Sequence, residues 1–336
     1  MHQSSERTIR WGIAGTGWIA EQFATNLALV PGAELRAVGS RTRDAADAFA
    51  DRFGIPVRHA GYRALAEDED VDVVYVAVPH PWHHEVALAA LRGGRNVLCE
   101  KPLTINADEA RELISEARHS GLFLMEAMWS RFLPSMVRVR RLLDAGAIGE
   151  VRSIRADLGM KLDSPRLRRP ELGGGALLDL GVYPVSFASF VLGRPDRITA
   201  VATMTEAGVD AQTSVVLEYP GGAQALLGCT MEVDGSSSAI IAGTEGRLEL
   251  DGPMHDPSSV RLVRGGDPEA APIEEFRLSE PGRGYRHEAI EVVRCLRAGL
   301  TESATMPLDE SISIMETLDE IRRQIGLRYA FERPIG

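Results

Sequence analysis

The stretch RWGIAGTGWIA, residues 10–20, decides the fold of the first part of this chain. It predicts a short strand, Arg10–Ala14, then a GxGxxA loop and a helix from Glu21 to Val30. In such a loop the first glycine permits a tight turn, the second lets a pyrophosphate approach, and the third small residue packs the helix against the strand. The N–H groups that begin the helix favour phosphate. We therefore predict a dinucleotide site that includes Gly15, Gly17, Trp18 and Ile19.

Strand and helix patterns alternate from this loop to residue 125. The run from Val71 to Val78 is almost continuously apolar, as in a parallel strand that is buried on both faces. Further strands are predicted at Glu34–Val38, Asn96–Cys99 and Leu122–Met125, and helices at Asp44–Phe53, Tyr62–Ala66, Pro81–Leu91 and Asn106–His119. Because this alternation is typical of a doubly wound parallel sheet, we predict an α/β chain with a Rossmann domain over residues 1–126.

The pattern changes between Glu126 and Pro134, where we place the domain boundary. Residues 127–336 are predicted to form a substrate-binding α+β domain with a mostly antiparallel open sheet. Its strands are expected at 149–159, 198–205, 213–219, 223–231, 239–243, 247–250 and 260–263, and its helices at 135–144, 176–192, 285–298 and 309–326. A basic loop, Lys161–Leu172, carries Arg166, Arg168 and Arg169; it either folds over the active site or is solvated.

Length and composition suit a soluble protein of two domains. The chain has 336 residues, of which 44% are hydrophobic and 25% are charged, as in ordinary globular proteins. A formal net charge of -11 argues against nucleic acid or an anionic membrane as the main partner. The sequence shows no hydrophobic signal region and no apolar run of membrane-spanning length. We therefore expect a cytoplasmic protein.

The cysteines and histidines do not predict a metal centre. Cys99, Cys229 and Cys295 lie far apart and form no CxxC or Cys/His spacing. Three sparse cysteines are also typical of a reducing compartment. The histidines near residue 80 have no carboxylate or cysteine beside them at ligand spacing, so no metal site is expected.

The second strand ends in Gly39-Ser40-Arg41, which bears on the choice of cofactor. An NAD enzyme usually places an acidic residue near this point to bind the ribose 2′-hydroxyl. A hydroxyl and a guanidinium at Ser40 and Arg41 suit the 2′-phosphate of NADP(H) instead. The alternative is that Arg41 and Arg43 are solvated residues that open the following helix.

Further candidate residues follow the next two strands, because ligands of open α/β sheets sit at the carboxyl ends of strands. His80 and His83 follow the strand 71–78, so they either touch the nicotinamide half of the cofactor or serve the structure. Glu100 and Lys101 leave the strand 96–99, and Pro102 favours an extended backbone at Lys101. We expect all four to line the cofactor site.

A second dense motif begins at Gly173-Gly174-Gly175 and continues through Asp179 and Tyr183. These two polar residues lie four positions apart, so on the predicted helix Ala176–Leu192 they share one face. The helix is otherwise apolar. Asp179 and Tyr183 therefore either take part in the chemistry or satisfy each other's hydrogen bonds.

The ordered set of GxGxxA, Glu100-Lys101-Pro102, and the triple glycine with Asp179 and Tyr183 resembles the Gfo/Idh/MocA oxidoreductase family. The resemblance covers essentially the whole chain. His80-Pro81 and the segment MEAMWSRF, residues 125–132, resemble more narrowly the dimeric dihydrodiol dehydrogenases and the NADP-dependent D-xylose dehydrogenases. This branch implies NADP(H) and a homodimer, or an oligomer built from dimers, formed through the open face of the second sheet.

The resemblance implies that hydride passes between the nicotinamide and a cyclic polyol or sugar, such as an aldose or a trans-dihydrodiol. Tyr183 would act as the general acid/base, in the place where inositol-type relatives carry a histidine. Lys101 would lower the tyrosine pKa and bind the reacting hydroxyl. Asp179 would orient Lys101 or Tyr183, or bind substrate, and Trp129 would form an apolar wall for a ring. The alternatives are a ketosugar reductase that acts on free or nucleotide-linked sugars and a dinucleotide-binding regulator without catalysis.

Overall fold

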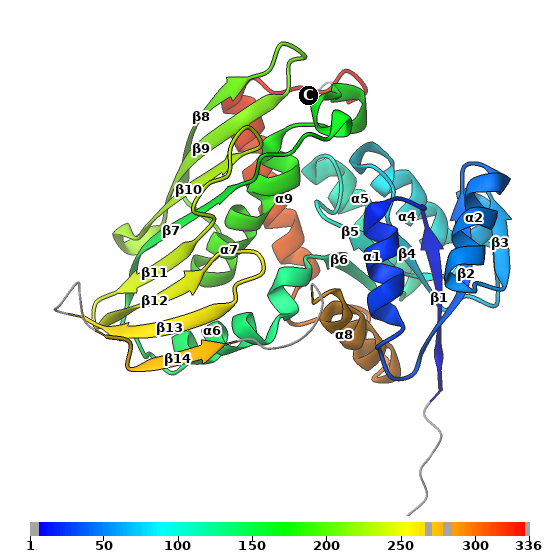
Figure 1. The fold of residues 1–336 in the computed structure, drawn as a ribbon, viewed down its shortest axis with the longest axis horizontal. Helices are drawn as coiled ribbons and strands as arrows, with labels where there is room; N and C mark the ends of the chain where they lie inside the picture. The colour runs from blue at the N-terminus through cyan, green and yellow to red at the C-terminus, as the bar shows by residue number, and fades with distance from the viewer. Residues whose placement is uncertain (1–6, 266–270, 278–283, 333–336) are drawn as a thin grey trace, which may run out of the picture. The chain divides into compact units, whose positions relative to one another are not determined.

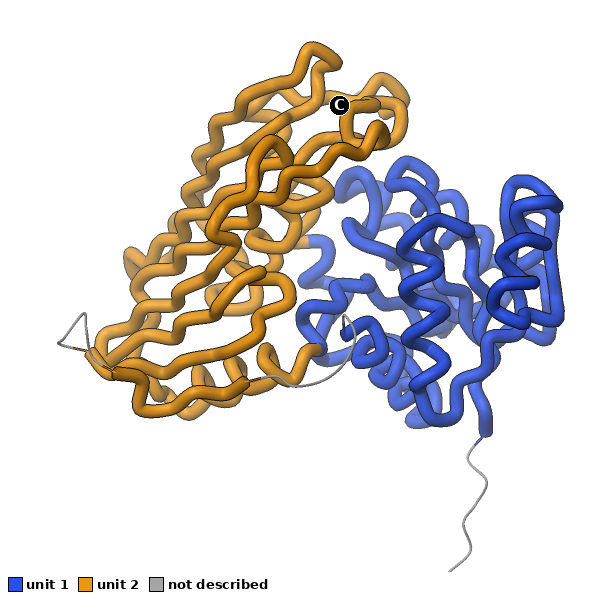
Figure 2. The backbone as a smooth tube through the Cα atoms, in the orientation of Figure 1, with its two compact units in different colours: residues 1–132, 282–312 blue, residues 133–281, 313–336 orange. Residues whose placement is uncertain are grey.

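The computed structural model describes residues 7–265, 271–277 and 284–332 of the chain (Figure 1). It divides into two compact units, Met1–Phe132 with Gly282–Ile312 and Leu133–Pro281 with Ser313–Gly336 (Figure 2). The expected domains, 1–126 and 127–336, differ from these units in one main respect. The helix α8 (Tyr285–Arg297) groups with the first unit because it packs against α1 (Trp18–Leu27).

The first unit is built on a six-stranded sheet with the order β3-β2-β1-β4-β5-β6, in which all the pairings are parallel. This is the strand order of doubly wound dinucleotide-binding folds, so the Rossmann prediction is confirmed. The strands are β1 (Ile9–Ala14), β2 (Ala33–Ser40), β3 (Val57–Ala60), β4 (Val73–Val76), β5 (Asn96–Glu100) and β6 (Leu124–Ala127). The helices between them are α2 (Arg43–Phe53), α3 (Tyr62–Ala66), α4 (His83–Arg92) and α5 (Ala107–Ser120), with short 3-10 turns η1 (His80–Trp82) and η2 (Trp129–Phe132).

The strand β3 of this sheet was not predicted from the sequence. This strand has four residues, pairs with β2 at the edge, and includes the polar residues Arg58 and His59. An edge strand that short has neither the apolar run nor the alternation from which strands are recognised. By contrast β4, whose four residues are all buried, lies inside the predicted run of 71–78.

The second unit holds an eight-stranded sheet with the order β14-β13-β12-β11-β7-β10-β9-β8. Its pairings are antiparallel except that between β7 and β10, as the mostly antiparallel prediction requires. The strands are β7 (Val151–Gly159), β8 (Arg197–Met204), β9 (Asp210–Glu218), β10 (Gln224–Thr230), β11 (Ala239–Gly243), β12 (Gly246–Asp251), β13 (Ser259–Arg264) and β14 (Glu274–Arg277). The last of these was not predicted, since its sequence EEFR carries three charges.

The helices of the second unit are α6 (Pro134–Asp144), α7 (Val182–Leu192) and most of α9 (Leu308–Ile325), of which α7 packs on β7 and β10. The stretch Pro170–Leu192 is long and apolar enough to cross a membrane by length and composition alone, which corrects the expectation that no such run exists. However, 78% of its apolar window is buried inside the structure. This is the burial of a core helix that packs against its own sheet.

Candidate active site

The loops that follow β2, β1, β4 and β5 lie side by side, because these strands are neighbours and parallel. Their carboxyl ends therefore form one continuous edge, which is where ligands bind in such sheets. Gly15, with φ of 115°, begins this edge after β1, and a Cβ there would lie 2.4 Å from the Ala77 carbonyl oxygen. Gly15 thus lets the first loop close tightly against the end of β4.

Gly17 is the N-cap of α1 and faces open space, since a Cβ placed on it would meet nothing within 4 Å. The adjoining Trp18 is 55% exposed at the start of the helix. A helix N-terminus with room in front of it suits a phosphate group. The loop therefore fits the pyrophosphate of a dinucleotide, as the sequence predicted for Gly15, Gly17, Trp18 and Ile19.

Ser40 ends β2 beside this loop, and its Oγ lies 3.5 Å from Thr16 Oγ1. Ser40 is buried, whereas Arg41 is exposed. Burial raises the pKa of Tyr62 on α3, and the positive charge of Arg41 partly offsets this rise. The hydroxyl and the guanidinium thus lie next to the glycine loop, where the ribose end of a dinucleotide would be expected.

Glu100 and Lys101 lie at the end of β5. Glu100 is 5% exposed, accepts a hydrogen bond from the Tyr75 hydroxyl through Oε1, and accepts the Lys101 N–H through Oε2 at 3.2 Å. Glu100 is therefore engaged inside the fold, while Lys101 is half-buried at the edge. This places Lys101 on the predicted side of the sheet.

His80 and His83 are both buried after β4, and their rings lie 5.5 Å apart edge to face. His83 is 0% exposed, and its two ring nitrogens each lie 2.9 Å from a backbone carbonyl oxygen, of Pro102 and of Val78. These contacts give His83 a structural task within the unit. Binding of cofactor by either histidine stays a prediction.

Trp129 was predicted as a wall for a ring-shaped substrate. It lies in η2, is 2% exposed, and packs against the ring of Tyr285 with centroids 4.7 Å apart. The ring is therefore part of the core beside α8 in this structure. Its contact with substrate stays a prediction.

The Asp179 motif of the second unit does not form the regular helix that was predicted. Leu177–Gly181 is a π-helical segment, and α7 begins at Val182. Asp210 of β9 holds the start of this segment, because its Oδ2 accepts the Leu177 N–H and the Thr213 hydroxyl, both at 2.8 Å. Gly175 makes room for it, since a Cβ at that position would lie 2.3 Å from Asp210 Oδ1. The third glycine of the motif is thus explained by a buried carboxyl group.

Asp179 forms an ion pair with Arg166, whose Nη2 lies 2.6 Å from Asp179 Oδ1. Arg166 comes from the basic loop, which folds into the short turns η3 (Pro165–Arg168) and η4 (Pro170–Leu172) and buries Leu167. Leu167 anchors this part of the loop, whereas Arg168 and Arg169 stay exposed to solvent. Whether the loop folds over a substrate stays a prediction. Tyr183 is 8% exposed, and its ring lies 4.9 Å from that of His255.

Sequence reasoning missed three residues around this motif. Arg166 was noted only as part of a basic loop, and Asp210 and His255 were not considered. Asp210 and His255 lie far along the chain, and Arg166 lies 13 residues before Asp179 in a short turn, so no helical or strand spacing connects them to the motif. Lys101 belongs to the first unit and Tyr183 to the second. Their pairing therefore stays a prediction.

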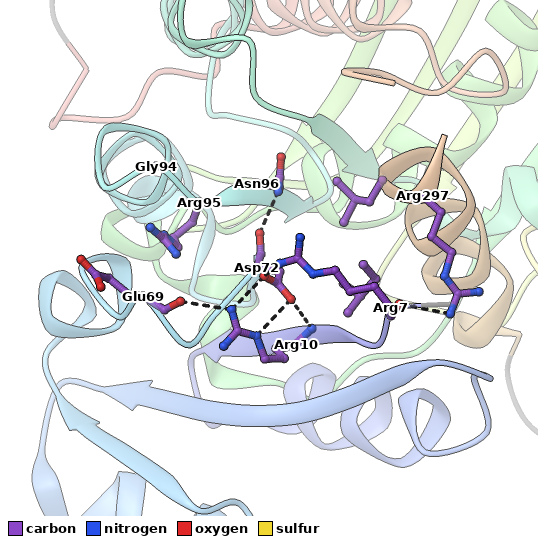
Figure 3. A pocket seen from close by; sticks show the side chains of 10 residues that line it. Arg7, Arg10, Glu69, Asp72, Gly94, Arg95, Asn96 and Arg297 are labelled. Carbon is purple, nitrogen blue, oxygen red and sulfur yellow. Dashed lines mark hydrogen bonds and ion pairs between the residues drawn. The ribbon is translucent and has the colours of Figure 1, made fainter. Parts of the chain in front are cut away.

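A pocket of about 710 Å³ opens at the opposite, amino-terminal edge of the parallel sheet (Figure 3). Arg10 and Arg7 both reach Asp72 there, with Arg7 Nη2 2.5 Å and Arg10 Nη2 3.1 Å from Asp72 Oδ1. Arg95 donates to the carbonyl oxygens of Val71 and Gly93. Because these guanidinium groups serve the fold, we assign this pocket to structure rather than to catalysis.

Among the described residues, no group of three or more His, Cys, Asp or Glu side chains could hold a metal ion. The three cysteines are free and buried.

A parallel sheet of dinucleotide-binding order, joined to an open-sheet α+β domain, fits an oxidoreductase of two domains. Residues 9–128 match the family model of the oxidoreductase family with an NAD-binding Rossmann fold. Residues 136–249 match the model of the GFO/IDH/MocA C-terminal domain. The chain belongs to the GFO/IDH/MocA oxidoreductase family, as the motifs predicted.

Relatives named trans-1,2-dihydrobenzene-1,2-diol dehydrogenase are similar over nearly the full length. The protein of Bos taurus is 39% identical over 330 residues, covering 96% of this chain and 98% of its own. That of Mus musculus is 40% identical over 334 residues, with the same coverage. These relatives confirm that the chain is an enzyme of the dehydrogenase class.

Two solved structures share the fold and sequence similarity. KijD10, a 3-ketoreductase from Actinomadura kijaniata in complex with NADP and TDP-benzene, has a TM-score of 0.84 and 31% identity, covering 95% of this chain and 98% of its own. An aldose-aldose oxidoreductase from Caulobacter crescentus, complexed with glycerol, has a TM-score of 0.85 and 25% identity, covering 95% and 97%. Both support the two-domain fold class predicted from the sequence.

Proposed function

We propose that this chain is an NADP(H)-dependent oxidoreductase that transfers hydride to or from a cyclic polyol or a sugar. The observation that carries the proposal is the 39–40% identity to dihydrodiol dehydrogenases over 96% of the chain. The NADP complex of KijD10 supports the cofactor. When bound, the nicotinamide supplies the hydride chemistry, and the protein must orient the reactants and move one proton.

The glycine loop would hold the pyrophosphate, because Gly17 leaves space at the N-terminus of α1. Ser40 and Arg41 would hold the 2′-phosphate, for which a guanidinium forms two parallel hydrogen bonds. Arg41→Ala should therefore lower kcat/KM for NADP by at least about tenfold, and change the value for NAD little. Steady-state rates with both cofactors test this. A preference of the unaltered enzyme for NAD would contradict the assignment.

Tyr183 is proposed as the general acid/base and Lys101 as its tuning partner. A tyrosine with the usual pKa of about 10 is a poor base at neutral pH, and a nearby cation stabilises the phenolate. Asp179 is proposed to orient these groups or to bind a substrate hydroxyl, and its ion pair with Arg166 fixes its carboxylate. Tyr183→Phe should abolish turnover while NADPH still binds, as measured by fluorescence titration. A near-normal rate would remove Tyr183 from the mechanism.

The substrate can be found with a panel of aldoses, ketosugars and trans-dihydrodiols, read by NADPH absorbance in both directions. A second candidate, reduction of a nucleotide-linked ketosugar, is favoured by the similarity to KijD10. The three arginines that could meet a diphosphate are each paired with a carboxylate: Arg166 with Asp179, Arg168 with Glu232, and Arg169 with Glu171. Faster turnover of nucleotide-linked than of free ketosugars would favour this candidate.

We also propose a homodimer that forms through the face of the second sheet opposite α7. Exposed apolar side chains gather there, with Val201 67% and Leu226 43% exposed on β8 and β10. Both side chains line a hollow of about 520 Å³. Val201→Glu with Leu226→Glu should yield monomers in light-scattering chromatography, and a monomeric native enzyme would contradict the proposal.

The buried free cysteines support a cytoplasmic location, which cell fractionation tests.

A further inference from the structure

The backbone that follows Lys101 leaves the sheet, yet buried side chains bind its polar groups in succession. The Lys101 N–H donates to Glu100 Oε2 at 3.2 Å, and the Leu103 N–H donates to Glu126 Oε1 at 3.1 Å. Between them, the Pro102 carbonyl oxygen lies 2.9 Å from His83 Nδ1. A buried side chain therefore meets the backbone at every residue from 101 to 103.

These three side chains come from different elements of the first unit. Glu100 ends β5, Glu126 lies in β6, and His83 begins α4. His83 and Glu126 are 0% exposed and Glu100 is 5% exposed, so solvent cannot replace the bonds. A buried backbone group without a partner costs free energy comparable to a lost hydrogen bond. The loop thus has one favoured position relative to the sheet.

His83 also connects this loop to the preceding one. Its Nε2 lies 2.9 Å from the Val78 carbonyl oxygen at the end of β4. A carbonyl oxygen only accepts, so a neutral ring donates to one of these two carbonyl oxygens and a doubly protonated ring donates to both. In either form the ring lies between the loops after β4 and β5, the two strands that precede the predicted nicotinamide side of the site.

We propose that His83 and Glu126 are positioning residues, which hold the Pro102–Leu103 backbone and thereby fix Lys101 at the edge of the sheet. The inference rests on the proposed function, in which Lys101 acts on the reacting groups. Misplacement of a catalytic group by about 1 Å can lower a rate by about 100-fold. Neither residue needs to contact substrate or cofactor to have this effect.

Two variants of Glu126 separate positioning from simple loss of the residue. Glu126→Leu removes the acceptor for Leu103 N–H, and kcat should fall by about 10- to 100-fold at an unchanged Kd for NADPH. Glu126→Gln keeps an acceptor oxygen at the same place, and kcat should return to within about threefold of the native value. An unchanged kcat in the leucine variant would overturn the proposal, as would a glutamine variant that is as slow as the leucine variant.

His83 provides a second test should Glu126→Leu fail to fold. His83→Ala should lower kcat, whereas His84→Ala, on the same helix turn, should leave it unchanged, because His84 pairs with Glu112 on α5 instead. Equal rates for the two alanine variants would contradict the role of His83.

A double variant distinguishes this inference from the function on which it rests. If Lys101→Met retains turnover, the catalytic role of Lys101 fails. If Lys101→Met is slow, adding Glu126→Leu should lower the residual kcat by less than about twofold, since both changes remove one function. A full additional loss would show that Glu126 acts independently of Lys101 and would overturn the positioning role alone.

Discussion

At the two edges of the parallel sheet in the first unit, the pKa values of carboxyl groups are shifted in opposite directions. At the amino edge, burial favours a raised pKa for Asp72, but the hydrogen bonds of Arg10 and the charges of Arg10 and Arg7 together leave it below its usual value. At the carboxyl edge, burial raises the pKa of Glu126 to about 7, and burial with the charge of Glu100 raises the pKa of Glu288 well above its usual range. One edge stabilises the fold through paired charges, whereas the other keeps costly buried acids close to Lys101.

Replacing one cation at each edge should give the largest difference in kcat between the two edges. Lys101→Met should lower kcat by about 1,000-fold, because it removes a group proposed to act on the transferred proton. Arg95→Met at the amino edge should leave kcat within about twofold, since its guanidinium donates to the carbonyl oxygens of Val71 and Gly93. Both variants are compared by kcat and by NADPH affinity. Similar losses in the two variants would mean that the edges do not divide function from structure.

Glu126 should give stability a pH dependence in one direction. Its pKa is about 7 in the folded chain against an ordinary value of 4.5, so between these values the folded state binds more protons and stability falls as pH rises. Glu126→Gln should remove this slope, and its stability relative to the native chain should rise by up to about 3 kcal/mol from pH 5 to pH 8. Urea unfolding at four pH values measures the difference, and parallel curves would contradict the assigned pKa.

Asp72 should show the opposite sign. Its lowered pKa means that its stabilising contribution is present above the unfolded pKa and is lost as pH falls through the folded value. Asp72→Asn should cost about 2 kcal/mol at pH 7, because it removes the charge that accepts from Arg10 and Arg7. The difference in the free energy of unfolding between the native chain and this variant should disappear at acidic pH, while kcat stays unchanged. A loss that is constant with pH would show that shape rather than charge makes the contribution.

The carboxyl edge was predicted from the sequence only in part. The strand, the glycine loop and the helix near Gly15 are local patterns, and they led correctly to the Rossmann sheet and to the placing of Lys101 at its carboxyl edge. The bonds of His83 and Glu126 to the loop of Pro102 and Leu103 could not be predicted, because 19 and 23 residues separate the partners.

The motif of the second unit shows the same limit. Its spacing predicted a regular helix face for Asp179 and Tyr183, but the segment is π-helical at Asp179. Asp210, 33 residues beyond Leu177, holds that segment in place. A contact between a helix and a strand 33 residues apart leaves no periodic pattern in the sequence.

The smallest expected effect tests whether burial or the number of ion pairs makes the amino edge stable. Arg7 reaches the same Asp72 oxygen as Arg10, but its side chain is 72% exposed against 30% for Arg10. Solvent and salt screen an exposed pair, so Arg7→Ala should cost at most about 0.5 kcal/mol, and added salt should remove this cost. Urea unfolding at low and high ionic strength measures it. A loss as large as that of Asp72→Asn, and insensitive to salt, would mean that the stability of this edge comes from the outer arginine rather than from the inner pair.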